Sequence, residues 1–187
     1  MRRPVSFTAA ASMSHACRIL TVRAPPGKDH DVTTEPLAAT DVPLHPRKTI
    51  YPPPFASQVA GRDRRRLGDH FGLTNFGVNL TELAPGSVSA LLHHHTKQDE
   101  FVYIVSGTPT LVLADREYPL RPGDCCGFKA GAAVGHQLVN RSPSAVLYLE
   151  IGDRTAGDYA SYPKDDLQFT QVEGGAWILT HKDGTPY

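Results

Sequence analysis

Side chains that can bind a metal ion are concentrated in a short central stretch of the chain. His93, His94 and His95 are consecutive, Glu100 follows after four intervening residues, and His136 lies further along. Neutral imidazole suits zinc, iron, copper and nickel, and a carboxylate adds tolerance for manganese. The sequence therefore predicts one divalent transition metal ion per chain, with Mn, Fe, Zn and Ni all open. An ion held by four such donors keeps one or two positions free for water or substrate, which suits catalysis.

Strand alternation distinguishes the three adjacent histidines. Successive side chains of a β-strand face opposite sides, so His93 and His95 point the same way and His94 points away. Glu100 stands at the head of the next strand-like run, after a tight turn. We therefore predict His93, His95, Glu100 and His136 as metal ligands; the alternative is a local bulge that puts His94 in place of His93. Glu100 is also the candidate catalytic residue, as a ligand or as a movable base that accepts a proton.

The elements around these donors have the sequence pattern of strands. From Leu73 onward, short apolar runs alternate with turns rich in Gly, Pro, Asn and Asp. This pattern predicts an all-β sandwich or barrel. The expected strands include residues 76–80, 101–105, 110–113, 125–128, 136–140, 145–151 and 177–180.

Two groups of residues resemble the sequence motifs of the cupin superfamily. The first motif reads Gly86, His93, His95, Glu100, Gly107, and the second reads Gly123, Gly131, His136, Asn140. Six residues rather than the usual five separate Gly86 from His93, Lys129 stands at a usual proline position, and the stretch from Gly131 to His136 is two residues longer than the common form. The resemblance covers roughly residues 74–152 and is closest to small single-domain bacterial cupins. It implies a double-stranded β-helix, a jelly-roll barrel with the metal inside one mouth, and it is far less specific for a reaction.

The chain divides into three parts on composition. Residues 1–60 are predicted to form a proline-rich arm, because closely spaced prolines exclude helix; the arm lies along a neighbouring subunit or is a solvated linker. Residues 61–160 form the barrel, and residues 161–187 form a tail packed on it. The charged run Arg62–Arg66 is interpreted as solvated surface, with phosphate binding as the alternative.

The pleat also assigns faces within the predicted barrel. If Glu100 points inward, Val102 and Ile104 do so too, while the residues between them face outward. By the same rule Leu138 and Asn140 follow His136 inward. The cavity around the metal is therefore expected to be largely apolar. The face of the strand at 145–151 is not fixed by any ligand.

Composition limits the partners and the compartment. Lys plus Arg and Asp plus Glu number 19 each, so no overall field favours nucleic acid or a membrane surface. No apolar run approaches the roughly 18 residues of a membrane span. The three cysteines, Cys17, Cys125 and Cys126, do not form an even set, which argues against a disulfide framework and fits a cytoplasmic protein; the adjacent pair is expected in the core. Residues 1–28 have the composition of a transit peptide, and an unfolded extension is the alternative.

Three functions are compatible with these residues. The first, with cupin sugar-phosphate isomerases as precedent, is Lewis-acid isomerase or lyase chemistry on a small oxygen-rich molecule. The second is an Fe(II)-dependent dioxygenase, and the third is a non-catalytic binding or sensor module. A sugar-phosphate isomerase needs cations near the cavity, for which Lys97, Lys129 and Arg141 are the nearby candidates in sequence. The expected partners are a small-molecule ligand and a second copy of the chain in a homodimer, without nucleic acid or membrane.

Overall fold

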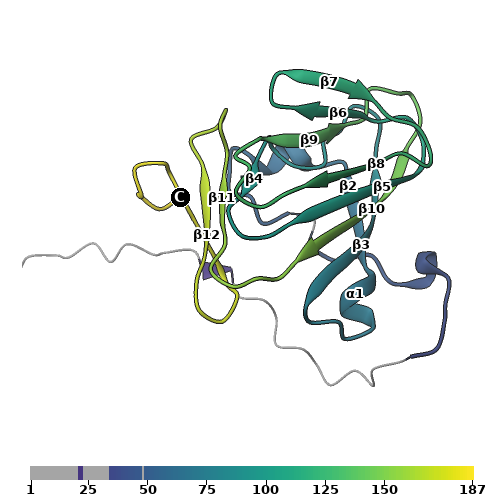
Figure 1. Cartoon of the computed structure of the whole chain (residues 1–187), viewed down its shortest axis with the longest axis horizontal. Helices are drawn as coiled ribbons and strands as arrows, with labels where there is room; N and C mark the ends of the chain where they lie inside the picture. Colours follow the sequence, from purple (N-terminus) through teal and green to yellow (C-terminus); the bar gives the residue numbers. More distant parts are fainter. Residues whose placement is uncertain (1–20, 23–33, 48) are drawn as a thin grey trace, which may run out of the picture.

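The computed structural model describes residues 21–22, 34–47 and 49–187, and within these ranges the chain is built mainly from short antiparallel strands (Figure 1). The helical segments there are the 3-10 turns η1 (Ala39–Asp41) and η2 (Ala56–Val59) and the short helix α1 (Leu67–His70). No helix among these residues is long and apolar enough to span a membrane. The predicted all-β class is confirmed.

The largest surface of the barrel, called here the central sheet, brings together strands from distant parts of the chain. Neighbouring strands in it are antiparallel. Helix α1 turns the chain from the first of these strands into the second. The order across the sheet is β2 (Arg62–Arg66), β3 (Phe76–Leu83), β10 (Val146–Asp153), β5 (Glu100–Ser106) and β8 (Cys125–Phe128).

Two further sheets complete the barrel. The C-terminal sheet has the order β1 (Thr21–Val22), β13 (Trp177–Thr180), β12 (Gln168–Gln171), β11 (Tyr159–Ser161) and β4 (His94–His95). The small sheet has the order β7 (Arg116–Pro119), β6 (Thr110–Leu113) and β9 (His136–Val139). In Figure 1, β11 and β12 stand to the left of the central sheet, and β6 and β7 lie above it.

A pair of backbone hydrogen bonds joins the C-terminal and small sheets. His93 and His136 form an antiparallel bridge in which each amide donates to the other residue's carbonyl, at 3.3 Å from His93 N and 2.9 Å from His136 N. This bridge stands next to β4 and at the start of β9. The barrel is thus closed at the position of two predicted metal ligands.

The predicted division of β5 into an inner and an outer face is confirmed. Ile104 is 0% exposed, whereas Phe101, Tyr103 and Val105 are 39%, 41% and 40% exposed. The sequence left open which face of the strand at 145–151 points inward. On β10 it is the face of Val146 and Tyr148, because both are fully buried. The inner residues form a core of seven buried side chains: Leu83, Val102, Ile104, Leu111, Leu138, Val146 and Tyr148.

Gly107 permits the sharp turn that follows β5. Its φ is +81°, and a Cβ there would lie 2.8 Å from Val146 Cγ2 and 2.9 Å from the Ala145 carbonyl oxygen. Only glycine meets both conditions without strain. This explains why the last glycine of the first motif falls where β5 ends.

The described part of the proline-rich arm lies against the chain's own barrel. Leu44 forms an isolated bridge with Arg65 of β2, and His45 N donates to Arg64 O at 2.7 Å. Further along, Tyr51, Phe55 and Val59 are buried in a second core behind the C-terminal sheet, together with residues such as Phe169 and Leu179. The arm therefore contributes side chains to the fold before residue 61, where the barrel was predicted to begin.

The tail and the cysteines were predicted with unequal success. Residues 177–180 form strand β13 as expected, and the strand is the middle partner of β1 and β12. The prediction that the adjacent cysteines are core residues is wrong for Cys125, which is exposed because it lies on the outer face of β8; Cys126 is half-buried. Cys17 lies outside the described residues.

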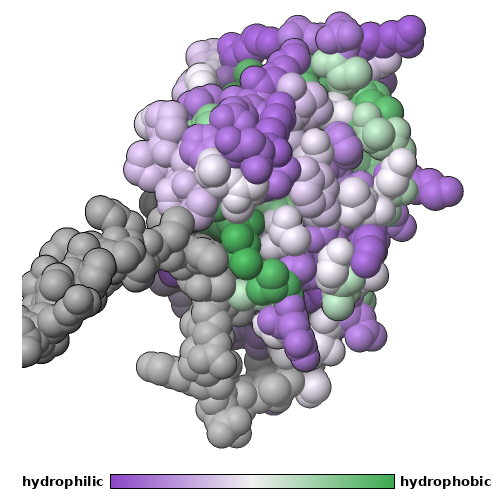
Figure 2. All heavy atoms as spheres, turned by 90° about the vertical axis from the view of Figure 1, so that its left-hand side faces the viewer, coloured by the Kyte–Doolittle hydropathy of each residue, from purple (hydrophilic) through white to green (hydrophobic). Residues whose placement is uncertain are grey.

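The face seen in Figure 2 is mostly hydrophilic, with a small hydrophobic area near its middle.

Candidate metal centre

The four predicted ligands converge on one carboxylate oxygen. Glu100 is the first residue of β5, and its Oε2 lies 2.8 Å from His136 Nε2 and 3.7 Å from both His93 Nε2 and His95 Nε2. His93 and His136 face each other in the bridge between two sheets, and His95 lies on β4. The three sheets thus place three imidazoles around one carboxylate.

Three of the four residues form the tightest group. The potential ligand atoms of His93, Glu100 and His136 all lie within 4.8 Å of one another. His95 lies outside this group but reaches the same Glu100 oxygen. His94 is not in the group, and its buried Nδ1 has no hydrogen-bond partner among the described residues.

The outer nitrogens of two histidines are held by hydrogen bonds. His93 Nδ1 lies 2.8 Å from the Leu91 carbonyl oxygen, and His95 Nδ1 is hydrogen-bonded to the Asp158 carboxylate. An Nδ1–H that donates to an acceptor leaves the Nε2 lone pair free, which is the usual support of metal-binding histidines. The donor set and its hydrogen bonding therefore fit a divalent transition metal ion.

Burial and charge set the ionisation of the centre. Burial lowers the pKa of His93 to about 4, against the opposing effect of Glu100, so this imidazole is neutral at physiological pH. Burial acts to raise the pKa of Glu100, but the hydrogen bond from His136 and the electrostatic effect of the surrounding imidazoles outweigh it and bring the pKa to about 2. A neutral imidazole and an ionised carboxylate are the forms that bind metal.

At His95, the effects that raise the pKa outweigh the effect of burial. Burial acts to lower its pKa, but the hydrogen bond to Asp158 and the charge of Glu100 raise it above its ordinary value. The same contact, with the backbone amide of Lys97 at 2.7 Å, lowers the pKa of Asp158 against the effect of burial. Asp158 is fully buried and remains ionised, so it orients His95 through a charge-assisted hydrogen bond.

Aromatic rings pack against the imidazoles. The Phe128 ring is stacked on His136 with centroids 3.6 Å apart, and the Tyr162 ring is stacked on His93 at 5.7 Å. The Trp177 ring meets His95 edge to face at 6.4 Å. Each imidazole therefore has an aromatic neighbour that restricts the orientations open to it.

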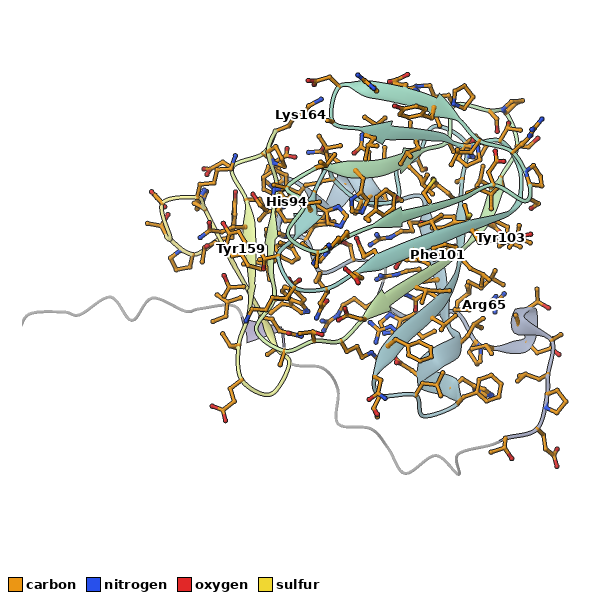
Figure 3. All side chains as sticks on the ribbon, viewed as in Figure 1. Arg65, His94, Phe101, Tyr103, Tyr159 and Lys164 are labelled. Atoms are coloured by element: carbon orange, nitrogen blue, oxygen red, sulfur yellow. The ribbon has the colours of Figure 1, made fainter. Side chains whose placement is uncertain are left out.

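A cavity of about 270 Å³ opens beside the four residues. Its apolar lining includes Phe128 and Val134, as the predicted apolar pocket requires, and its charged and polar lining includes Lys129 and Gln98. Glu100, His95 and His136 form one wall of the cavity, and His94 also reaches it. His94, labelled in Figure 3, belongs to β4, the edge strand of the C-terminal sheet next to β11.

The three cations expected near the cavity, Lys97, Lys129 and Arg141, lie in different places. Lys129 lines the cavity. Arg141 does not, because it forms a two-point ion pair with Glu117 at 2.7 and 3.0 Å on the surface. Lys97 Nζ lies instead beside Gly157, 3.1 Å from where a Cβ on that residue would be.

Sequence reasoning missed Asp158. It follows the predicted barrel core and stands in no motif, so nothing in its spacing linked it to His95. What brings Asp158 to His95 is the pairing of β11 with β4, in which Ala160 lies opposite His95. That pairing joins residues more than 60 positions apart.

Comparisons with known proteins agree with this geometry. A family model described as a cupin domain matches residues 79–152. Comparison with curated protein sequences gave no match.

Two solved structures resemble the chain over most of its length. A sugar phosphate isomerase of the cupin superfamily from Silicibacter pomeroyi is 39% identical, with 82% of this chain and 96% of that chain covered and a TM-score of 0.77. A proposed sugar phosphate isomerase from Acidithiobacillus ferrooxidans is 32% identical, with 68% and 82% covered and a TM-score of 0.62.

A polyketide cyclase from Streptomyces resistomycificus shares the fold alone, at 19% identity and a TM-score of 0.53, with 65% of this chain and 80% of that chain covered. The family match and the first relative, covered almost completely at 39% identity, establish the classification predicted from the two motifs. The barrel is a double-stranded β-helix, and the chain belongs to the cupin superfamily.

Proposed function

We propose that this protein is a metal-dependent isomerase of a small hydroxy-carbonyl compound of the sugar phosphate kind. The observation that supports this most directly is the convergence of three imidazoles on the Glu100 carboxylate, with His95, Glu100 and His136 lining a cavity of about 270 Å³. His93, His95, Glu100 and His136 would hold the ion. The ion, when bound, polarises a carbonyl group and stabilises negative charge that develops on its oxygen.

The chain's own residues can supply the proton transfer. Isomerisation between an aldose and a ketose moves one proton from the carbon beside the carbonyl to the carbonyl carbon. A second proton moves from the hydroxyl oxygen on the first carbon to the former carbonyl oxygen, and no oxidant or reductant is needed. Glu100 uses Oε2 for its histidine contacts, and among the described residues nothing hydrogen-bonds to its other oxygen. That oxygen is free to accept the proton and return it.

The surroundings favour a reaction that excludes bulk water. Leu113, Phe128 and Val134 give the cavity apolar walls, which limit the water around the reacting carbon. Lys129 supplies one positive charge at the same cavity. The two relatives that carry the sugar phosphate isomerase name support the same substrate class.

The test is proton exchange with solvent. Purified protein would be loaded separately with Mn, Fe, Zn and Ni and incubated in deuterated water with aldose and ketose phosphates and with the corresponding unphosphorylated sugars. We expect interconversion, with deuterium entering at the carbon beside the carbonyl, for wild type and not for Glu100→Gln. Metal-loaded protein that exchanges no substrate proton would contradict the proposal, and substrate-dependent oxygen uptake would replace it with a dioxygenase.

We also propose that the protein is a homodimer. The outer face of β5 exposes Phe101, Tyr103 and Val105, which alternate along the strand. Figure 3 labels Phe101 and Tyr103, to the right of β11 and β12. A contiguous apolar area on a sheet face is typical of a subunit interface. A second copy of the chain, with the same face, would cover it.

A further inference from the structure

The polar side chains that line the cavity are not equally engaged. Three of them belong to the metal centre, and Gln98 donates from its amide nitrogen to the Thr155 carbonyl oxygen at 2.9 Å. His94 and Lys129 line the same cavity, and within the part of the chain that the structure describes neither side chain has a hydrogen-bond or ion-pair partner. Two polar side chains are therefore available to a ligand.

The His94 ring offers a ligand one of its two nitrogens. Nδ1 is buried and has no hydrogen-bond partner among the described residues. Nε2 has no partner there either, but it is not buried, so a molecule in the cavity can reach it. An N–H that is buried without an acceptor is costly, so the neutral ring keeps its proton on Nε2. A charged ring carries a proton there as well, and His94 is thus a donor at Nε2 in either form.

The other histidines of the centre are arranged differently. His93 and His95 both have acceptors at Nδ1, which leaves their Nε2 lone pairs free for a metal ion. His136 has an unpaired Nδ1 like His94, but its Nε2 already lies 2.8 Å from the Glu100 carboxylate. Among the described residues of this site, His94 is therefore the histidine that presents an unused N–H.

Backbone hydrogen bonds hold Lys129 beside the strand of His94. Lys129 begins a turn in which Ala132 N donates to the Lys129 carbonyl oxygen at 3.2 Å and Gly131 has a φ of +74°. Gly131 N donates to the His95 carbonyl oxygen at 2.9 Å, which ties this turn to β4. The two unpaired side chains thus come from adjoining segments at one cavity.

Charge and size indicate which ligand these two side chains suit. Among the residues that line the cavity, Lys129 is the cation and Glu100 is the carboxylate, and a divalent ion bound at Glu100 would more than offset its negative charge. An ammonium and an imidazole N–H both form charge-assisted hydrogen bonds with anionic oxygens. A cavity of about 270 Å³ suits one small molecule, so both donors act on the molecule that reaches the metal centre.

We propose that the His94 Nε2–H and the Lys129 ammonium together bind the anionic group of the substrate, a phosphate ester or a carboxylate. The inference rests on the proposed function in that the anion belongs to the molecule whose carbonyl lies at the metal centre. It gives the three consecutive histidines two tasks, because His93 and His95 hold the ion and His94 holds the ligand. It also gives a task to the lysine that stands at the usual proline position of the second motif.

Titration of the full-length, metal-free protein with inorganic phosphate, and in a second arm with acetate, tests the site. Long-range proton–nitrogen NMR spectra of protein with nitrogen-15 in its histidines report both the tautomer and the binding. We expect the neutral His94 ring to carry its proton on Nε2, and the His94 signals to move as the anion binds. The anion that binds more tightly identifies the group.

Matched variants assign the binding to the two side chains. His94→Phe keeps a flat ring without the donor and should weaken binding about tenfold, the effect of losing a hydrogen bond to a charged group. His94→Gln should restore most of it, because the glutamine amide reaches the place of Nε2. Lys129→Met should also weaken binding, whereas Lys164→Met should not, since Lys164, labelled in Figure 3, is exposed and does not line the cavity.

A structural or metal-binding role for His94 would give different results. After reconstitution with zinc, His94→Phe should retain metal at the wild-type ratio; loss of zinc would overturn the proposal. Wild type that binds neither anion, a neutral His94 with its proton on Nδ1, or His94→Gln no better than His94→Phe would each do so too.

The exposed lysine keeps the test decisive if His94→Phe does not fold by circular dichroism. Lys129 can be replaced without disturbing the core, and unchanged affinity in Lys129→Met refutes the site. Binding needs no turnover, so a failed isomerase assay with anion binding that depends on His94 and Lys129 removes the reaction and leaves the site. Isomerisation without such binding removes the site and leaves the reaction.

Discussion

At the scale of single residues, hydrogen bonds and ring contacts hold the histidine side chains of the centre in place. Hydrogen bonds to Leu91 O and Asp158 hold His93 and His95 with Nε2 toward Glu100. Ring stacking holds His136. Strand alternation, which is local, was enough to select His93 and His95 as predicted donors, and the second motif added His136. The sequence did not predict Asp158, whose contact with His95 depends on the pairing of distant strands.

Removal of one imidazole should empty the centre. We expect His95→Ala to lose bound metal after reconstitution, by more than the roughly 10–100-fold typical of changes in supporting residues. Elemental analysis of the dialysed protein measures this. His94→Ala is the matched control, since it removes the adjacent histidine from the same strand and should retain metal at the wild-type ratio. Equal metal content in both variants would refute the assignment of His95.

Metal retention should depend on pH through His95. A protonated imidazole cannot bind metal, and the pKa of His95 is raised above 6.5 while that of His93 is about 4. As pH falls through the raised pKa, protons displace the ion, and His93 does not compete until the solution is much more acidic. Asp158→Asn removes a cause of the raised pKa, so its release curve should shift to lower pH. Identical curves from equilibrium dialysis would contradict this.

At the scale of elements, Asp158 joins two strands that are far apart in sequence. Besides His95, it accepts hydrogen bonds from the amides of Thr96 at 3.0 Å and Lys97 at 2.7 Å, which follow β4. It stands just before β11. One carboxylate therefore secures both the ligand and the edge of the C-terminal sheet.

Loss of this charge should destabilise the metal-free protein. We expect Asp158→Asn to lower the free energy of unfolding at neutral pH by about 1–3 kcal/mol, the usual cost of weakening hydrogen bonds to a buried charged group. Because the folded-state pKa of Asp158 is below the ordinary 3.8, its contribution is complete above that pH and is lost as pH falls further. The difference from wild type should therefore shrink in acid. Denaturant titrations measure it, with Asp115→Asn in an exposed turn as the control; a constant difference would refute the account.

The strands themselves were predictable to different degrees. Runs such as 101–105 and 110–113 were recognised because apolar residues alternate in them. Strand β2 was not, since its sequence Arg62–Arg66 reads as a charged surface run. Alternation applies to charged residues as well, and it places Arg62, Arg64 and Arg66 on the inner face. What decides their burial is the neighbouring strand β3, which local sequence cannot reveal.

At the scale of the whole molecule, the central sheet has two faces with different roles. Its inner face carries Glu100, and its outer face exposes an apolar row on β5. The arm covers part of that outer face through the bridge between Leu44 and Arg65, and leaves Phe101 and Tyr103 exposed. We propose that a second copy of the chain covers this exposed row.

A charge on this face should separate the subunits. We expect wild type to have the mass of a dimer in light scattering and Tyr103→Lys to have the mass of a monomer, because the lysine would be buried without a partner at the interface. Tyr118→Lys is the control, since Tyr118 is 40% exposed on β7, away from this face. A monomeric wild type, or a dimeric Tyr103→Lys, would refute the proposed interface.

The position of Asp158 has a consequence for how such chains are recognised and divided. The segment that matches the cupin domain ends at residue 152, and all four donors lie within it. The carboxylate that orients His95 and the rings of Tyr162 and Trp177 come afterwards. A homologue that keeps both motifs but diverges after residue 152 would therefore look intact by its motifs and yet have lost the support of its histidines. The matched segment identifies the family, whereas the support of its histidines has to be judged from the residues that follow residue 152.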